Sequence, residues 1–109
     1  MSSTPPTGDE LLAALAALAN PHRLRIVAAL AGKRNYVSQL ARELQMSRPL
    51  LHIHAQRLEE AGIIRATLEL SKDGKAMKYL ELTSFEIVLS AASIAAAVPT
   101  LGTDTKEKK

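Results

Sequence analysis

The apolar residues of this chain fall into stretches whose spacing changes along the sequence. Four stretches have apolar residues at the spacing of a helix with one buried face, and the next two alternate apolar with polar residues, as strands do. A further Ala-rich helical stretch follows them. The predicted helices cover 9–19, 21–30, 36–44, 47–61 and 84–97, and the predicted strands cover 64–70 and 76–82.

The ends of these stretches coincide with residues that start or stop helices and turns. Asn20 and Ser47 are good N-caps, and each is followed by a proline in the first turn of the next helix. Gly62 is expected to end the fourth helix. Asp73-Gly74 is a strong hairpin-turn signal between the two strands. The run 83–86, Thr-Ser-Phe-Glu, matches a capping box and predicts the start of the last helix there.

The order helix, helix, helix, helix, strand, strand, helix predicts a mainly α domain with a small β-hairpin, which is the plan of a winged helix-turn-helix. We expect residues 1–8 to be a disordered leader, 9–98 to be the folded domain and 99–109 to be a polar, disordered tail. The second helix is expected to bury Leu24, Ile26, Val27 and Leu30.

Composition narrows the class of protein. The chain has 109 residues, of which 47% are hydrophobic and 3% aromatic, so one domain with an aliphatic core is expected. It has no cysteine, which excludes disulfides and thiolate metal sites. No apolar run approaches the roughly 18–20 residues of a membrane span, and the start does not have the pattern of a signal peptide. A cytoplasmic protein without a membrane partner is therefore expected.

Positive charge is concentrated in the middle of the chain. The formal net charge is +3, but residues 21–83 carry eleven Lys or Arg against six Asp or Glu, a balance of +5. A basic stretch on a compact domain favours a polyanionic partner, although an ordinary solvated surface accounts for the charge alone equally well. The chain lacks a cysteine nucleophile, a Gly-rich phosphate loop and a plausible pair of carboxylates with a histidine. An enzyme is therefore not expected.

The segment 36–64 combines a helix, a tight turn and a second helix, which is the spacing of a helix-turn-helix. One face of the second helix is predicted to be buried against the core. The other face, near the N-terminus of this helix, is predicted to read the major groove of DNA. The exposed Ile53 is expected to meet an apolar group there, such as a thymine methyl. A merely solvated helix face is the alternative. At 100° per residue, the residues on the buried face of this helix are Leu51, His54, Ala55, Leu58 and Ala61.

The hairpin supplies a second basic surface, because its lysines cluster at or near the turn. Basic wings of this kind contact the phosphate backbone or the adjacent minor groove. For any single lysine, a turn kept soluble by its charge is the alternative. The predicted DNA contacts are Ser47, Arg48, Pro49, Leu50, His52, Ile53, Gln56, Arg57, Lys72, Lys75 and Lys78.

Several segments together resemble the ArsR/SmtB family of winged-helix regulators, over about residues 15–89. Residues 18–26, LANPHRLRI, are similar to the opening pattern of the family, and 37–41, VSQLA, to the entry of its third helix. Residues 47–49 with His54, followed by LEEAGII at 58–64, are similar to its recognition helix and exit. The resemblance implies a transcriptional repressor that binds a double-stranded DNA operator and releases it on a signal, which in many members is a metal ion.

The resemblance also implies a homodimer built from the first and last helices. Both helices are rich in alanine, which lets helices approach closely, so their composition agrees with this role. The predicted dimer-interface residues are Leu11, Leu12, Leu15, Leu18, Ile87, Ala91, Ile94 and Ala95.

The usual metal ligands of the family are missing from this sequence. Tyr36 and Ser38 stand where the family often has cysteines, and the predicted last helix has no histidine and only Glu86. His52 and His54 point about 200° apart on a helix, so they cannot bind one ion together. His54 matches a position where the family often has histidine, and a packing or hydrogen-bonding role is expected for it. We expect no metal and no cofactor.

Three hypotheses for the function stay open. The preferred one is a dimeric DNA-binding regulator whose signal is unknown. The second adds a response to nickel, zinc or cobalt through a site without cysteine, for which His22, Asp9, Glu10 or a partner subunit would supply ligands. The third is a protein-interaction module that works with a separate sensor protein.

Overall fold

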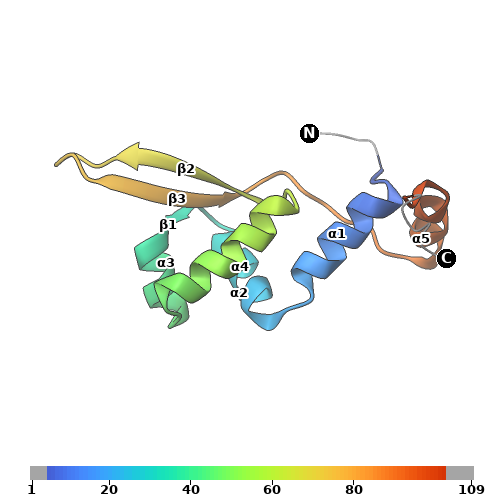
Figure 1. The fold of residues 1–109 in the computed structure, drawn as a ribbon, viewed down its shortest axis with the longest axis horizontal. Helices are drawn as coiled ribbons and strands as arrows, with labels where there is room; N and C mark the ends of the chain where they lie inside the picture. The colour runs from blue at the N-terminus through green and yellow to red at the C-terminus, as the bar shows by residue number, and fades with distance from the viewer. Residues whose placement is uncertain (1–4, 103–109) are drawn as a thin grey trace.

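The computed structural model describes residues 5–102. The hairpin of β2 (Ile64–Leu70) and β3 (Ala76–Leu82) is extended by β1 (Asn35–Tyr36) on the other edge of β3, in the order β1-β3-β2, with antiparallel pairing throughout. The fold class predicted from the sequence, a mainly α winged helix-turn-helix, is confirmed. The elements, shown in Figure 1, are α1 (Gly8–Leu18), α2 (Pro21–Leu30), β1 (Asn35–Tyr36), α3 (Val37–Leu44), α4 (Arg48–Glu60), β2 (Ile64–Leu70), β3 (Ala76–Leu82), α5 (Ala91–Ala97) and the 3-10 helix η1 (Val98–Thr100).

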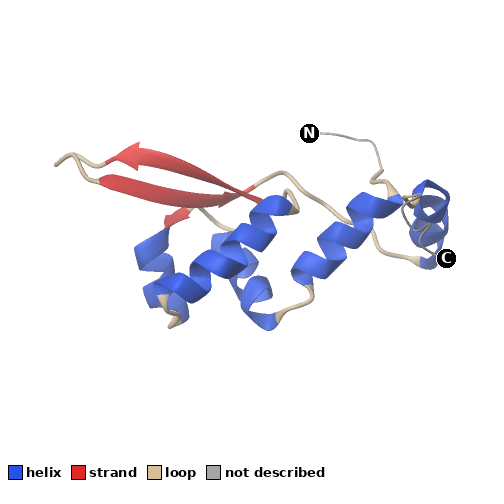
Figure 2. Cartoon of the chain, viewed as in Figure 1, coloured by secondary structure: helices blue, strands red, loops and turns tan. Residues whose placement is uncertain are grey.

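One aliphatic core holds α2, α3, α4 and the base of the sheet together. In Figure 2 the hairpin projects from this helical body at one end of the molecule, and α5 lies at the other end, beyond α1. Leu24 is an exception to the predicted core, because 54% of it is exposed to solvent on α2. The largest fully buried side chains are Ile26, Leu40, Leu51, Leu58, Ile63, Ile64 and Leu80.

The helices begin where the capping residues of the sequence predicted. The Asn20 side chain accepts hydrogen bonds from the backbone N–H groups of His22 and Arg23, at 2.9 and 3.4 Å. The Ser47 hydroxyl accepts one from the N–H of Leu50 at 3.1 Å. These bonds satisfy donors that the first turn of a helix leaves without an intrahelical partner. As a result α2 has the predicted bounds, and α4 starts directly after Ser47.

Strand β1 was not predicted from the sequence. Its two residues pair with the middle of β3, Asn35 with Leu80 and Tyr36 with Tyr79. A strand of this length carries no alternating pattern, so its existence depends on β3 offering a free edge.

The predicted start of the last helix at 84 is wrong. Thr83 continues the contact between the strands instead of capping a helix, because its N–H donates to the Ile63 carbonyl at 2.9 Å and its hydroxyl donates to the Gly62 carbonyl at 2.7 Å. Residues 83–90 form an irregular connection, and α5 covers only Ala91–Ala97. Its capping box is made by Ser90 and Ser93. The tertiary contacts of Thr83 therefore override a valid local signal.

The predicted leader at 1–8 and tail at 99–109 are both longer than the structure allows. Thr7 is the N-cap of α1 in a capping box with Glu10, and Gly8 belongs to the helix. The Gly8 N–H donates to the Thr100 hydroxyl at 2.7 Å, and the N–H of Gly102 donates to Asp9 at 2.8 Å. Hydrogen bonds across the sequence thus join the start of α1 to residues 100 and 102. Residues 1–4 and 103–109 lie outside the described part of the chain.

The close contact at Gly8 requires a glycine. A Cβ atom there would lie 2.7 Å from the Ala97 carbonyl oxygen and 2.7 Å from a Leu101 methyl carbon. Such distances are not tolerated, so the start of α1 approaches α5 and η1 only because position 8 has no side chain.

The turn between α3 and α4 has a residue in the left-handed region, and this suggests a test of the fold. Gln45 has φ 55° and ψ 47°, a conformation that glycine adopts at lower cost than other residues. We expect Gln45→Gly to raise the free energy of unfolding by about 0.5–1 kcal/mol in urea denaturation. Arg42→Gly, in the last turn of α3, is the matched control and should lower it by about 1 kcal/mol. A loss of stability in both variants would contradict this account of the turn.

Candidate nucleic-acid interface

Helix α4 is held by one face and exposes the other. Leu51 and Leu58 are fully buried and Ala55 nearly so, and His54 completes this buried face. Four of the five positions that the sequence placed on this face are thus buried, and the fifth, Ala61, is half-buried at the C-cap of the helix. Residues on the opposite side of α4 therefore face solvent.

The predicted contact residues of α4 are all exposed, and Ile53 is the most unusual of them. Its side chain is 57% exposed although it is apolar and lies in the middle of the helix. Leu50 is exposed at 36%. Ser47 is also exposed, but its hydroxyl already caps the helix by accepting from the N–H of Leu50. The predicted set thus lies on the surface, with one member engaged in the local structure.

Part of this set lines one open hollow of about 530 Å³ between the first turns of α3 and α4. Arg48, Pro49, His52 and Ile53 come from α4, and Val37 comes from α3. Val37 was not among the predicted contacts, because the sequence placed it on the buried face of its own helix. Within the described residues the side chains of Arg48 and His52 have no hydrogen-bond or ion-pair partner, so their polar groups are available to a ligand.

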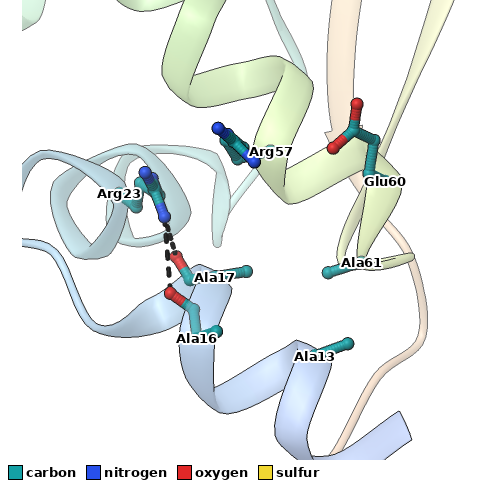
Figure 3. Close-up of a pocket in the computed structure, with 7 residues that line it drawn as sticks. All are labelled: Ala13, Ala16, Ala17, Arg23, Arg57, Glu60 and Ala61. Atoms are coloured by element: carbon teal, nitrogen blue, oxygen red, sulfur yellow. Dashed lines mark hydrogen bonds between the residues drawn. The ribbon is translucent and has the colours of Figure 1, made fainter. Parts of the chain in front are cut away.

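Arg57 lies at a different hollow from these residues. It stands with Glu60 and Ala61 on the C-terminal half of α4, opposite the alanine face of α1, around a space of about 340 Å³ (Figure 3). Arg23 of α2 closes the same space and donates to the carbonyl groups of Ala16 and Ala17, at 3.4 and 3.3 Å. The structure therefore separates Arg57 from the group around Arg48.

The wing carries its lysines at the tip, as predicted for Lys72 and Lys75, which are both exposed in the turn. The turn is closed by the Ser71 N–H, which donates to the Lys75 carbonyl at 2.8 Å, and Gly74 adopts the positive φ of 84° that the turn needs. Lys78 lies farther along β3, opposite Leu68, and is half-buried. Two of the three lysines therefore form the tip and the third lies beside the strands.

The middle and outer part of the wing are braced by a cluster that the sequence did not reveal. The Arg34 guanidinium lies 4.1 Å from the ring centre of Tyr79 and also donates two hydrogen bonds to Glu69 of β2, one of them 3.1 Å long. Tyr36 of β1 meets Tyr79 edge to face at 5.8 Å. The hydrogen bond from Arg34 lowers the pKa of the Glu69 carboxyl, so this pair stays charged over the ordinary pH range. No spacing in the sequence connects residues 34, 69 and 79, since only the strand register brings them together.

A polar cluster joins the buried side of α4 to α2. The Arg23 Nε–H donates to Nδ1 of His54 at 3.1 Å, and the His22 ring lies 5.1 Å from the His54 ring. The structure thus gives His54 the hydrogen-bonding role that the sequence analysis expected. Burial lowers the pKa of His54 below its ordinary value, and the nearby charges of Arg23 and His22 add to the effect.

The alternative metal site is not assembled within one chain. Among residues 5–102, no three His, Asp or Glu side chains are grouped closely enough to hold an ion. Glu10 takes part in the capping box of α1, and Asp9 accepts from Gly102, both away from the His22–His54 contact. A metal response through a shared site stays a prediction. In the same part of the chain, no helix is long and apolar enough to cross a membrane.

Comparison with known proteins matches the segment that contains the exposed face of α4 to a known family. Residues 20–66 match the protein-family model described as "Bacterial regulatory protein, arsR family". They form an arsR-family helix-turn-helix. The segment takes in α2, α3, α4 and the start of β2. The family resemblance inferred from the sequence is thereby confirmed.

A relative of the arsR segment is also described as a transcriptional regulator of the helix-turn-helix type. The chain is 37% identical over 54 residues to the HTH-type transcriptional regulator MJ0229 of Methanocaldococcus jannaschii, a match that takes in 50% of this chain and 57% of the relative. The chain thus matches little more than half the length of that relative.

Solved structures extend the similarity beyond the arsR segment to most of the fold. The transcriptional repressor BigR of Xylella fastidiosa is 24% identical, with a TM-score of 0.59 over 93% of this chain and 90% of that one. The homodimeric winged helix-turn-helix DNA-binding domain of Mb0332 from Mycobacterium bovis is 22% identical, with a TM-score of 0.61 over 90% and 82%. At these identities the likeness is one of fold. The three proteins are described as transcription regulators, in agreement with the expectation that this chain is not an enzyme.

The His54 cluster predicts how the stability of the arsR-type fold depends on pH. Because the pKa of His54 is lower in the folded chain than in the unfolded one, the unfolded chain binds the proton more readily. The free energy of unfolding should therefore fall as the pH drops through about 6.5, the ordinary histidine value, and the loss is complete below the lowered pKa. Urea denaturation at pH 7.5 and at pH 5.5 measures this difference.

A pair of variants separates His54 from the other groups that titrate. His54→Asn removes the titration and should reduce the dependence on pH, whereas the exposed His52→Asn should keep the wild-type dependence. Equal pH dependence in the wild type and His54→Asn would show that the cluster does not behave as the geometry predicts.

Proposed function

We propose that this chain is a dimeric, sequence-specific DNA-binding transcriptional regulator that acts as a repressor, with α4 in the major groove and the hairpin as a basic wing. The observation that carries the proposal is the exposed face of α4. It presents Arg48, His52 and Ile53 together on a helix whose other face is fixed in the core. An α-helix fits the major groove, where each base pair offers a distinct set of donors, acceptors and methyl groups.

The charge along α4 supports this orientation. Arg48 stands at the first position of the helix, and the acidic residues Glu59 and Glu60 stand at its last two positions. At 1.5 Å per residue the two ends are about 18 Å apart. The N-terminal half of α4 is therefore free of acidic side chains of its own and suits a polyanion, whereas the C-terminal half does not.

The wing supports a second contact with the same duplex. Lys72 and Lys75 lie at a tip that projects from the helical body (Figure 1), and lysines at such a tip suit phosphate groups. The Arg34–Tyr79–Glu69 cluster ties the outer half of the wing to the residue that precedes β1, which supports the position of the tip relative to α4. A preset arrangement of two contacts costs less on binding than one that must form on the DNA.

Apolar surface at the opposite end of the molecule supports the homodimer. On α1 and α5, Leu12 is 58% exposed and Ile94 is 43% exposed, and Ala91 and Ala95 are exposed beside it. Leu11, from the predicted interface, is instead buried within the chain. The remaining predicted interface residues, half-buried in the single chain, are Leu15, Leu18 and Ile87. The relative Mb0332 is described as homodimeric and BigR as a repressor, and we extend both properties to this chain.

Substitutions on the two basic elements should affect DNA binding in different ways. Lys75→Ala removes a phosphate contact, so it should weaken binding to all duplexes similarly and reduce the slope of log affinity against log salt by about 1 per copy of the site. Arg48→Ala removes a base contact, so it should cost about 1–3 kcal/mol on the preferred duplex and relax its sequence preference. Fluorescence anisotropy across a salt series measures both effects.

The control variant is Arg25→Ala. It removes one positive charge from the exposed side of α2, outside both basic elements. It should leave affinity and salt slope at their wild-type values. Equal affinity of the wild-type protein for every duplex would contradict the proposal, as would wild-type binding by the Arg48→Ala, Lys75→Ala double variant.

The dimer can be tested with two leucines of similar exposure. Leu12→Glu places a charge on the proposed interface and should give monomers in analytical ultracentrifugation, because a buried unpaired charge is costly. Leu24→Glu changes a leucine that is 54% exposed on α2 and should leave the dimer intact. Circular dichroism checks that both variants fold. Monomeric wild-type protein would show that the chain forms no dimer. Dissociation by Leu24→Glu but not by Leu12→Glu would show that the interface lies elsewhere on the surface.

A further inference from the structure

The hollow between α3 and α4 has a chemical character that points to one group on the DNA. Three of its five lining residues, Val37, Pro49 and Ile53, are apolar, and the other two, Arg48 and His52, carry polar groups. We propose that this hollow binds the 5-methyl group of a thymine, and that Val37 and Ile53 are residues that determine specificity. The inference rests on the proposed function, since it requires α4 to enter the major groove.

The apolar lining comes from two helices; Val37 also packs against the edge of the core, whereas Pro49 and Ile53 are exposed. Ile53 is 57% exposed, Pro49 is exposed in the first turn of α4, and Val37 is half-buried at the first position of α3. The turn around Gln45 sets these two helix starts side by side. An apolar surface assembled from separate elements is unfavourable in water unless a ligand covers it.

Thymine supplies the matching surface. Among the groups that the four bases show in the major groove, its C5-methyl is the aliphatic one, and the others are hydrogen-bond donors and acceptors. A neighbouring protein helix could cover an apolar hollow too, but the hollow here adjoins the unpaired guanidinium of Arg48 at the non-acidic end of α4. That combination favours DNA over an apolar protein surface.

The polar residues beside the hollow extend this to the neighbouring base. Arg48 can donate two parallel hydrogen bonds, the arrangement that guanine O6 and N7 accept. His52, one turn along α4, belongs to the same lining and can donate or accept one hydrogen bond. We therefore expect a thymine next to a guanine in each half-site, the methyl set against Ile53 and the guanine against Arg48.

Replacing thymine by uracil tests this, because the change removes the methyl and leaves the base pairing intact. A duplex with high affinity is first selected from a random pool, and each of its thymines is then changed to uracil in turn. In each half-site one such change should weaken binding about fourfold, the effect of burying roughly one methyl or methylene group. Changes at the other thymines should have little effect.

Protein variants connect the effect to the hollow. Ile53→Ala should bind the thymine and uracil duplexes with equal affinity, and Val37→Ala should reduce the fourfold ratio. Lys75→Ala, on the wing, should weaken both duplexes and keep the ratio. Since Ile53 is exposed and alanine favours helices, circular dichroism should show that Ile53→Ala is folded.

The possible outcomes separate this inference from the function on which it rests. If no sequence is enriched and binding is non-specific, the proposed function fails. If binding is specific but no uracil change matters, or if Ile53→Ala keeps the fourfold ratio, only the methyl site is overturned. Unchanged DNA binding by Ile53→Ala on thymine duplexes would likewise overturn it and would leave the hollow to a protein partner.

Discussion

The burial of one face of α4 is the constraint on which the rest of this structure depends. Leu51 and Leu58 lose all contact with solvent, and transfer of such a side chain from water contributes about 1.5–3 kcal/mol. A rotation of the helix about its axis would expose both leucines and bury Arg48 or Ile53 instead. The core therefore decides which side chains face outward. In this sense the exposed face of α4 is a consequence of the packing of α2 and α3 against α4.

The wing needs a separate support because it extends beyond that core. Leu80 anchors β3, but Leu68 and Leu70 of β2 are 71% and 76% exposed, so the outer part of the hairpin has little apolar packing of its own. The Arg34 guanidinium compensates by stacking on Tyr79 and bonding to Glu69 across the strands. A two-stranded ribbon without such support is marginally stable. The position of the lysines relative to α4 thus depends on a polar and aromatic cluster.

Local signals in the sequence were sufficient wherever the structure is locally determined. Asn20 and Ser47 cap the helices that they predicted, and both strands of the hairpin have the predicted bounds, because capping and alternation act over a few residues. They failed where distant contacts decide. Thr83 donates to the Gly62 and Ile63 carbonyls just before β2 instead of capping a helix, and Gly8 bonds to Thr100 of η1, far along the chain.

The candidate site also combines features that local sequence determines with features that depend on tertiary packing. The exposed residues of α4 follow from helical phase, so the sequence located Arg48, His52 and Ile53 correctly on one surface. The contribution of Val37 depends on how two helix starts meet across the turn, and the separation of Arg57 depends on where α1 lies. Neither spacing nor propensity contains that information, since both relationships arise only when the helices have packed.

The central claim is that two copies of this winged helix place their α4 helices in the major groove of one operator. Hydroxyl-radical footprinting on a duplex selected from a random pool tests it directly. The account predicts two protected regions related by two-fold symmetry, centred about 34–36 Å apart or a multiple of that distance, which is one turn of the DNA helix. Weak and uniform protection along the whole duplex, with no symmetric pair of regions, would contradict the account.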